Sequence, residues 1–225
     1  MKQCIFCHSF KLYVKSKTQW RCVTCKRIWS EAKYQKELLI LEAFLADKSI
    51  LDCAKMCGVN YITAKNIYHK IRLLLTSFAQ ERYLNQSDTF SEYDEFYYLP
   101  KTKRNQNQYL FDAIGVFGML YEEWVYTLLL PDQFTPIKRL MEHDVPSPDE
   151  NATYARTLQR HKVTHISRFE HRLGTFWNYF EAWIAHFKGV KKENLIYYLK
   201  EAEFKFNYTP KEQKKILTQL WKQNM

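Results

Sequence analysis

The sequence predicts an α+β fold in which a small cysteine-based module and a helical segment precede a mixed α/β domain. Two CxxC pairs lie within residues 1–30, and helical patterns dominate residues 31–83. Strand-like segments then occupy residues 92–130 and are followed by further helical patterns. Strands followed by helices within one segment are typical of a mixed core. The predicted divisions are therefore 1–30, 31–85, 90–208 and a C-terminal helix at 209–225.

The composition is that of a globular protein with a basic surface. Hydrophobic residues make up 46% of the 225 residues, which excludes a disordered chain and suffices for one sizeable core. The formal net charge is +10, and residues 1–30 contain seven Lys and Arg residues but no acid. Because phosphate contacts release counterions, this charge favours a polyanionic partner such as a nucleic acid.

The sequence contains no segment that predicts secretion or insertion into a membrane. Its apolar runs are shorter than a membrane span, and Lys15 and Lys17 interrupt what would be the apolar region of a signal peptide. We therefore expect a cytoplasmic protein that does not bind membranes. In a reducing compartment, the six cysteines are expected to be metal ligands or buried thiols rather than disulfides.

Four of the cysteines form a zinc-ribbon signature. Cys4 and Cys7 make one CxxC pair, Cys22 and Cys25 make a second, and 14 residues separate the pairs. Each pair supplies two thiolates from a tight turn, and two pairs complete the tetrahedral shell that zinc requires. A closed shell of four thiolates leaves no open position for chemistry, so the expected Zn²⁺ is structural.

Three other residues that could bind metal are expected to have different roles. His8 is an alternative zinc ligand, but its expected position is exposed to solvent. Cys53 and Cys57 lie at helical i, i+4 spacing among apolar residues. They are therefore expected to be core thiols.

Residues 49–72 have the form of a helix-turn-helix. A short amphipathic helix ends at Gly58, where a left-handed residue is favoured, and Asn60 can cap the next helix. The residues expected to face inward are Ala64, Ile67 and Ile71. The residues expected to face outward are Tyr61, Lys65, Asn66 and His69. In a DNA-binding protein this outward face enters the major groove, whereas in an ordinary helical hairpin it is only solvated. The adjacent basic module favours DNA binding.

The second half of the chain changes to strand-like patterns and then to helical ones. Strands are predicted at 92–100, 109–120 and 124–130, with a turn at 121–123. Helices are predicted near Thr135 and at about 170–188, 192–205 and 210–223, with an irregular segment at 145–151. The basic loop at 101–108 either contacts DNA or is solvated; its cations are Lys101, Lys103 and Arg104.

The block at residues 173–207 resembles the end of the catalytic domain of zinc-ribbon DDE transposases from small bacterial insertion sequences. The agreeing positions are Phe176, Trp177, Asn178, Phe187, Gly189, Val190, Tyr198, Leu199, Lys200, Glu201, Glu203, Phe204, Phe206 and Asn207. Asp94-Glu95 resembles the first acidic strand of the family, and Asp149 resembles its second Asp. With the two N-terminal motifs, the resemblance covers nearly the whole chain.

The resemblance implies an RNase H-like fold and metal-dependent phosphoryl transfer on DNA. Carboxylates would hold two Mg²⁺ or Mn²⁺ ions, one activating the nucleophile and the other stabilising the leaving oxygen. The implied partner is double-stranded DNA, bound at the terminal inverted repeats of an insertion sequence. Because transposition usually needs two protomers that hold two DNA ends, a homodimer is expected by analogy.

The sequence departs from the family at its third acidic position. The Asn of the family aligns with His171 and the following Glu aligns with Gly174, so a carboxylate is missing. His171 is either a ligand that completes a site with Asp94 and Asp149 or a surface histidine. Glu181 is a second candidate, but it lies ten residues after His171, about three helical turns away, and is too distant to share a metal with it.

Three hypotheses therefore remain open from the sequence: an active transposase, an inactive descendant that keeps DNA binding, and a regulator without transposase ancestry. Asp149 is either a metal ligand or a helix cap, and Asp144 competes for its role. Gly174 and the nearby prolines favour inactivity, whereas Asp94-Glu95 and the 173–207 block favour activity. The transposase interpretation requires Asp94 at the middle of a small sheet, with the helix that carries Trp177 packed across it.

Overall fold

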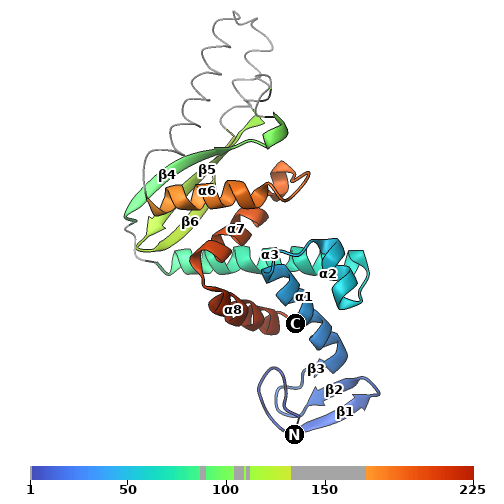
Figure 1. Ribbon diagram of the computed structural model, residues 1–225. Coiled ribbons are helices and arrows are strands. Elements are labelled where there is room, and N and C mark those ends of the chain that lie inside the picture. Colours follow the sequence, from blue (N-terminus) through green and yellow to red (C-terminus); the bar gives the residue numbers. More distant parts are fainter. Residues whose placement is uncertain (1, 87–89, 104–108, 110–111, 133–170) are drawn as a thin grey trace, which may run out of the picture. The chain divides into compact units, whose positions relative to one another are not determined.

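The computed structural model describes residues 2–86, 90–103, 109, 112–132 and 171–225. Within these ranges the fold is α+β, with six α-helices and two three-stranded antiparallel sheets (Figure 1). The chain divides into two compact units: one combines residues 1–77 with residues 208–225, and the other comprises residues 78–207. Among the described helices, every one is too short or too polar to cross a membrane.

The first unit begins with a small sheet that holds the cysteines. Strands β1 (Leu12–Ser16), β2 (Gln19–Cys22) and β3 (Ile28–Trp29) lie in sequential order. Trp20 and Trp29 are cross-strand partners, and Trp29 is buried against Cys4 and Cys22. This core consists of a few residues, and cores of this size usually need an additional cross-link for stability.

Three helices follow and confirm the predicted helical segment. They are α1 (Glu31–Leu45), α2 (Ile50–Cys57) and α3 (Tyr61–Leu84). Gly58 ends α2 in the left-handed conformation, with φ of 60°. The Asn60 side chain accepts a hydrogen bond of 2.7 Å from the backbone N–H of Thr63, as expected of an N-cap. Cys53 and Cys57 are buried, as predicted for core thiols.

The C-terminal helix packs with these N-terminal helices. Helix α8 (Pro210–Gln223) starts with a capping box built by Thr209 and Glu212. One face of α8 is buried, and it carries Gln213, Leu217 and Trp221. The Trp221 indole donates a 3.0 Å hydrogen bond to the buried Glu37 carboxylate on α1. Residues from the two ends of the chain therefore share one core.

The second unit contains the other sheet, whose strand order is β4-β5-β6. The strands are β4 (Glu92–Tyr98), β5 (Ile114–Tyr121) and β6 (Trp124–Leu129). The second strand was predicted to begin at residue 109, which was wrong by five residues, because β5 begins at Ile114. Asp112 precedes the ladder and pairs with Lys103 instead. The tight β5–β6 connection needs a left-handed residue, and Glu122 supplies it with φ of 55°.

Different helices cover the two faces of this sheet. Helices α6 (Arg172–Ile184) and α7 (Leu195–Asn207) pack on one face, and the short 3-10 turn η3 (Lys192–Asn194) leads into α7 (Figure 1). The last turns of α3 cover the other face, where Tyr83 stacks on Tyr126 with ring centroids 4.3 Å apart. The predicted helix near Thr135 and the irregular segment at 145–151 lie outside the described residues.

Helix α7 closes the free edge of strand β6 through polar side chains. The Asn207 amide donates to the carbonyl of Val125 (2.7 Å) and accepts from its N–H (2.9 Å). About one turn earlier, Glu203 accepts a hydrogen bond from the N–H of Thr127 (3.0 Å), and about two turns earlier Lys200 donates to the Thr127 carbonyl (2.7 Å). These bonds satisfy the backbone groups that an edge strand would otherwise leave unpaired.

Gly118 in β5 permits the closest approach between the sheet and α6. A Cβ atom at this position would lie 2.6 Å from Cζ2 of the fully buried Trp177. We expect Gly118→Ala to destabilise the protein by about 1–3 kcal/mol, because the packed ring cannot move away without strain. Chemical denaturation measures this change. The double variant with Trp177→Phe should lose less stability than the two single changes added together; a Gly118→Ala protein of wild-type stability would contradict the packing.

Candidate metal centre and acidic pocket

The two CxxC pairs fold into two turns with the same hydrogen bonds. In the first turn, the N–H of His8 donates to the carbonyl of Cys4, and His8 has φ of 58°. In the second, the N–H of Lys26 donates to the carbonyl of Cys22, and Lys26 has φ of 63°. Each turn brings two thiols toward the cluster. It requires one residue in the left-handed conformation, which is uncommon for residues other than glycine.

The four sulfur atoms form a cluster of the size that a metal requires. They lie within 4.8 Å of one another, with Cys4 and Cys25 separated by 3.6 Å and Cys7 and Cys22 by 3.5 Å. Four thiolates around tetrahedral zinc, each about 2.3 Å from the metal, lie about 3.8 Å apart. These cysteines could therefore hold a metal such as zinc. Among the described residues, no other group of three or more His, Cys, Asp or Glu side chains is gathered in this way.

Replacing one cysteine tests the four-thiolate assignment. We expect Cys22→Ser to abolish stoichiometric zinc binding, because Cys22 is completely buried and its sulfur lies 3.5 Å from that of Cys7 within the cluster. Zinc content by atomic absorption measures this directly, and Cys53→Ser serves as the control because Cys53 is a core thiol outside the cluster. A folded Cys22→Ser protein that retains one zinc per chain would rule out the assignment.

The second candidate site is a pocket of about 400 Å³ where β4 meets the start of α6. The residues that line it are Ser91, Glu92, Tyr93, Asp94, His171, Leu173 and Gly174. The chain places Asp94 here because strand residues alternate between two faces. Glu92, Asp94 and Phe96 face α6, whereas Glu95 lies on the other face. Of the two adjacent acids, Asp94 is therefore the one that enters the pocket.

Asp94 is held by groups from β4 and α6. One carboxylate oxygen accepts a 3.1 Å hydrogen bond from the indole N–H of Trp177, and the other accepts a 2.8 Å bond from the backbone N–H of Glu95. The Trp177 ring is itself fixed by stacking on Phe96, with centroids 4.9 Å apart. This confirms that the Trp177 helix packs across Asp94. The expectation that Asp94 lies at the middle of the sheet was wrong, because β4 is an edge strand of the described sheet.

The pocket contains one acid, Glu92, that was not predicted from the sequence. Glu92 lies on the same face of β4 as Asp94, and its carboxylate is 3.3 Å from Nδ1 of His171. The two-residue spacing from Asp94 was the available signal, because residues i and i+2 of a strand share a face. Gly174 also lines the pocket, so this position of α6, where the resemblance predicted a Glu, contributes no carboxylate to it.

The remaining predicted site residues either lie outside the described residues or do not line the acidic pocket. Asp149, Asp144 and Arg104 lie outside the described residues. Glu181 is on α6 but is absent from the described lining of the pocket. Lys101 belongs to a short 3-10 turn, and Lys103 forms a 3.0 Å ion pair with Asp112. Glu95 binds the hydroxyl of Tyr97, and burial together with this carboxylate raises the pKa of Tyr97 to about 12.

The outward residues of α3 are solvent-exposed, as their helical spacing predicts. These residues are Tyr61, Lys65, Asn66 and His69. The inward positions Ala64 and Ile71 are completely buried, and Ile67 is partly buried. A polar and basic face is therefore presented beside the turn at Gly58.

Together, the cysteine cluster and the acidic pocket define a protein with an N-terminal module that could hold a metal and a second unit that presents a carboxylate. The chain is similar to an uncharacterized transposase-like protein of Haemophilus influenzae, with 29% identity over 116 residues. The similarity covers 44% of this chain and 94% of that protein, and it supports a transposase-related function. No protein-family model and no solved structure matches the chain.

Proposed function

We propose that the chain is a DNA transposase of the insertion-sequence type, which binds the ends of its element and cuts DNA with the help of metal ions. The hydrogen bond between Trp177 and Asp94 carries this proposal. It joins the two segments that resemble the transposase family, the first acidic strand and the 173–207 block. They are distant in sequence, yet one pocket contains the acid of the first segment and the helix of the second.

The metal chemistry requires oxygen ligands at this pocket. Asp94 and Glu92 offer carboxylates and His171 offers an imidazole. Asp149, which resembles the second Asp of the family, is proposed as a further ligand. Bound Mg²⁺ or Mn²⁺ would supply a nucleophile at neutral pH and stabilise the negative charge of the leaving oxygen. The role of Trp177 is to fix the orientation of the Asp94 carboxylate, because a precisely oriented ligand lowers the cost of assembling the site.

The N-terminal unit is proposed to bind DNA as a helix-turn-helix that is preceded by a zinc ribbon. The exposed face of α3 offers Lys65, Asn66 and His69 to base edges or phosphates. Structural zinc would stabilise the small ribbon, whose own hydrophobic core is minimal. The basic charge of the whole chain, +10, provides the attraction to the phosphate backbone.

Restoring the missing carboxylate tests the cleavage proposal. We expect Gly174→Glu to increase Mn²⁺-dependent nicking of DNA that carries the ends of the element by about 10- to 100-fold. Loss of a residue that only supports a metal ligand typically lowers activity by this factor, so adding a direct ligand should raise activity by at least as much. The new side chain would enter the pocket beside Asp94. Nicking of a supercoiled plasmid, followed on agarose gels, measures the rate.

Gly174→Gln is the matched control for this experiment. Both substitutions replace a helical glycine and should stabilise α6 by about 0.5–1 kcal/mol, but only Glu adds a charge. If wild type and Gly174→Glu both fail to nick with Mg²⁺ or Mn²⁺, the cleavage proposal fails.

A catalytically inactive transposase descendant is the second candidate. Gly174 favours it, since the described lining of the pocket contains no carboxylate from α6. Such a protein would still bind DNA through its N-terminal unit and would act as a regulator. If the wild type and Gly174→Glu both bind duplex DNA but neither nicks it, the protein is an inactive descendant and not an active transposase.

A further inference from the structure

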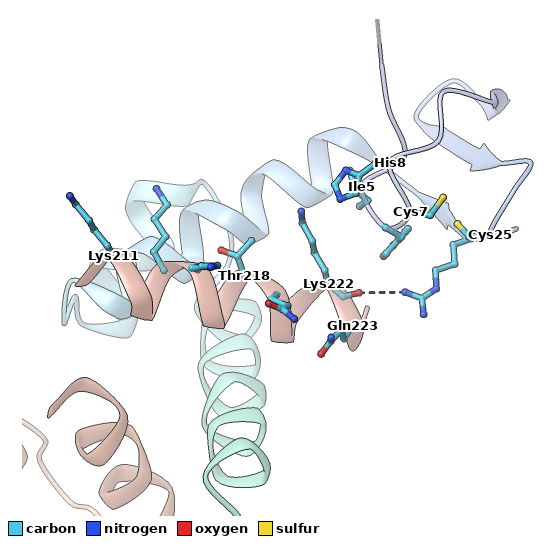
Figure 2. Close-up of a pocket in the computed structure, with 13 residues that line it drawn as sticks. Ile5, Cys7, His8, Cys25, Lys211, Thr218, Lys222 and Gln223 are labelled. Carbon is cyan, nitrogen blue, oxygen red and sulfur yellow. Dashed lines mark hydrogen bonds between the residues drawn. The ribbon is translucent and has the colours of Figure 1, made fainter. Parts of the chain in front are cut away.

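A groove in the N-terminal unit lies between α8 and the cysteine module, and it borders the cysteine cluster at Cys7 and Cys25. Its volume is about 1080 Å³ (Figure 2). The ribbon contributes one wall, which includes Ile5, Cys7, His8 and Arg27, and α8 contributes the other. We propose that this groove binds the phosphate backbone of duplex DNA. The proposal deepens the proposed function and rests on its DNA-binding part.

Apart from the thiols of Cys7 and Cys25, the charged side chains that line the groove are all basic. Its described lining includes five Lys and Arg residues and no Asp or Glu. These cations are Arg27, Lys211, Lys214, Lys215 and Lys222. A cleft lined by one sign of charge concentrates the field and attracts polyanions. The neutral donors Thr218, Gln219 and Gln223 add hydrogen-bonding groups of the kinds that contact phosphates.

The cations of α8 are arranged along the helix rather than around it. Lys211, Lys215, Thr218 and Lys222 follow one another at intervals of four, three and four residues, which places them on one helix face. This stripe is about 16 Å long, given the rise of 1.5 Å per residue. The same distance corresponds to about five base pairs of a duplex, at 3.4 Å per step. A linear stripe therefore fits a backbone better than it fits a single compact anion.

The stripe is held in place by the opposite face of α8. That face buries Leu217 and Trp221, while Lys214 forms a 2.7 Å ion pair with Glu42 of α1. On the ribbon side, the guanidinium of Arg27 lies over the ring of Phe6 and donates a 3.4 Å hydrogen bond to the carbonyl of Lys222 (Figure 2). Both walls are thus anchored before any partner binds, so a ligand does not have to order them.

The salt dependence of DNA binding tests the groove. The triple variant Lys211→Gln/Lys215→Gln/Lys222→Gln leaves the Lys214–Glu42 pair intact. Binding of a fluorescein-labelled duplex of mixed sequence is followed by anisotropy between about 50 and 200 mM salt. Each lost phosphate contact lowers the slope of log K against log salt by about 0.9, so we expect the slope to fall by about 2 to 3 and the affinity to fall roughly 100-fold.

A second triple variant controls for net charge. Lys48→Gln/Lys188→Gln/Lys191→Gln removes three exposed lysines outside the groove and should keep the wild-type slope. A slope that is equally reduced in both variants, or unchanged in the α8 variant, overturns the groove assignment while the proposed function stands. If the wild type does not bind the duplex even at low salt, both proposals fail.

Competition identifies the class of partner. Poly-glutamate should displace the duplex only at a large excess, because it lacks the regular backbone that fits the stripe. Poly-glutamate binding as tight as that of the duplex, and lost in the α8 triple variant, would assign the groove to an acidic protein instead.

Discussion

Asp94→Ala is expected to abolish Mn²⁺-dependent nicking while DNA binding stays at the wild-type level. If Asp94 is a metal ligand as proposed, its loss removes several kcal/mol of transition-state stabilisation, which corresponds to about a 10³-fold or greater decrease in rate. DNA binding should persist because the N-terminal unit is unaltered. The experiment is best done in the Gly174→Glu background as well, where the expected higher rate widens the measurable range.

The chain provides a closely matched control for this loss. Glu95 is the neighbouring acid, but it lies on the other face of β4 and binds the hydroxyl of Tyr97. We therefore expect the Glu95→Ala protein to nick DNA at the wild-type rate. Since Asp94→Ala also loses the hydrogen bond from Trp177, thermal denaturation should confirm that it remains folded. Equal nicking by the wild type and Asp94→Ala would remove the pocket from the mechanism.

Lys200→Met is expected to have the largest effect on stability, a loss of about 3–5 kcal/mol. Lys200 and Glu203 are almost completely buried, with their charged groups 2.7 Å apart. Burial raises the pKa of Glu203 and lowers that of Lys200, whereas the ion pair opposes both shifts. Removing the lysine leaves a buried carboxylate without its counter-charge and the carbonyl of Thr127 without its donor. Urea denaturation monitored by circular dichroism measures the change.

The double variant Lys200→Met/Glu203→Leu separates the cost of an unpaired charge from the loss of packing. It should be more stable than Lys200→Met alone, because no buried charge remains. It should still be less stable than the wild type, because the N–H and carbonyl of Thr127 lose their partners at the edge of β6. A Lys200→Met protein within about 1 kcal/mol of the wild type would show that water reaches this pair.

Local chemistry made several elements predictable from sequence. The helix that ends at Gly58 and the cap at Asn60 follow from residues that favour those backbone conformations. The final helix at residues 210–223 was predicted with its observed bounds, because Thr209, Pro210 and Glu212 form a strong start signal. The CxxC spacing likewise predicted the cysteine cluster, since the tight turns that supply two thiols each are local structures.

The pairing of distant residues could not be derived in the same way. Nothing near Glu37 in the sequence indicates that it is buried, because its partner is the indole of Trp221 at the other end of the chain. The charged residues of the 173–207 block resembled a family signature, but their role at the edge of β6 depends on a strand that precedes them by about 75 residues. Glu92 became a member of the pocket only when α6 brought His171 to it.

The sequence by itself determined the two cysteine turns, the helices that flank Gly58 and the alternation that places Asp94 and Glu95 on opposite faces of their strand. Each of these depends on a few neighbouring residues and their backbone preferences. Only the tertiary structure decided that the Trp177 indole binds Asp94, that Gly174 faces the same pocket, and that α8 lines a basic groove with the ribbon. Those contacts form when apolar faces from separate segments are buried together, and burial depends on the whole fold rather than on any one segment.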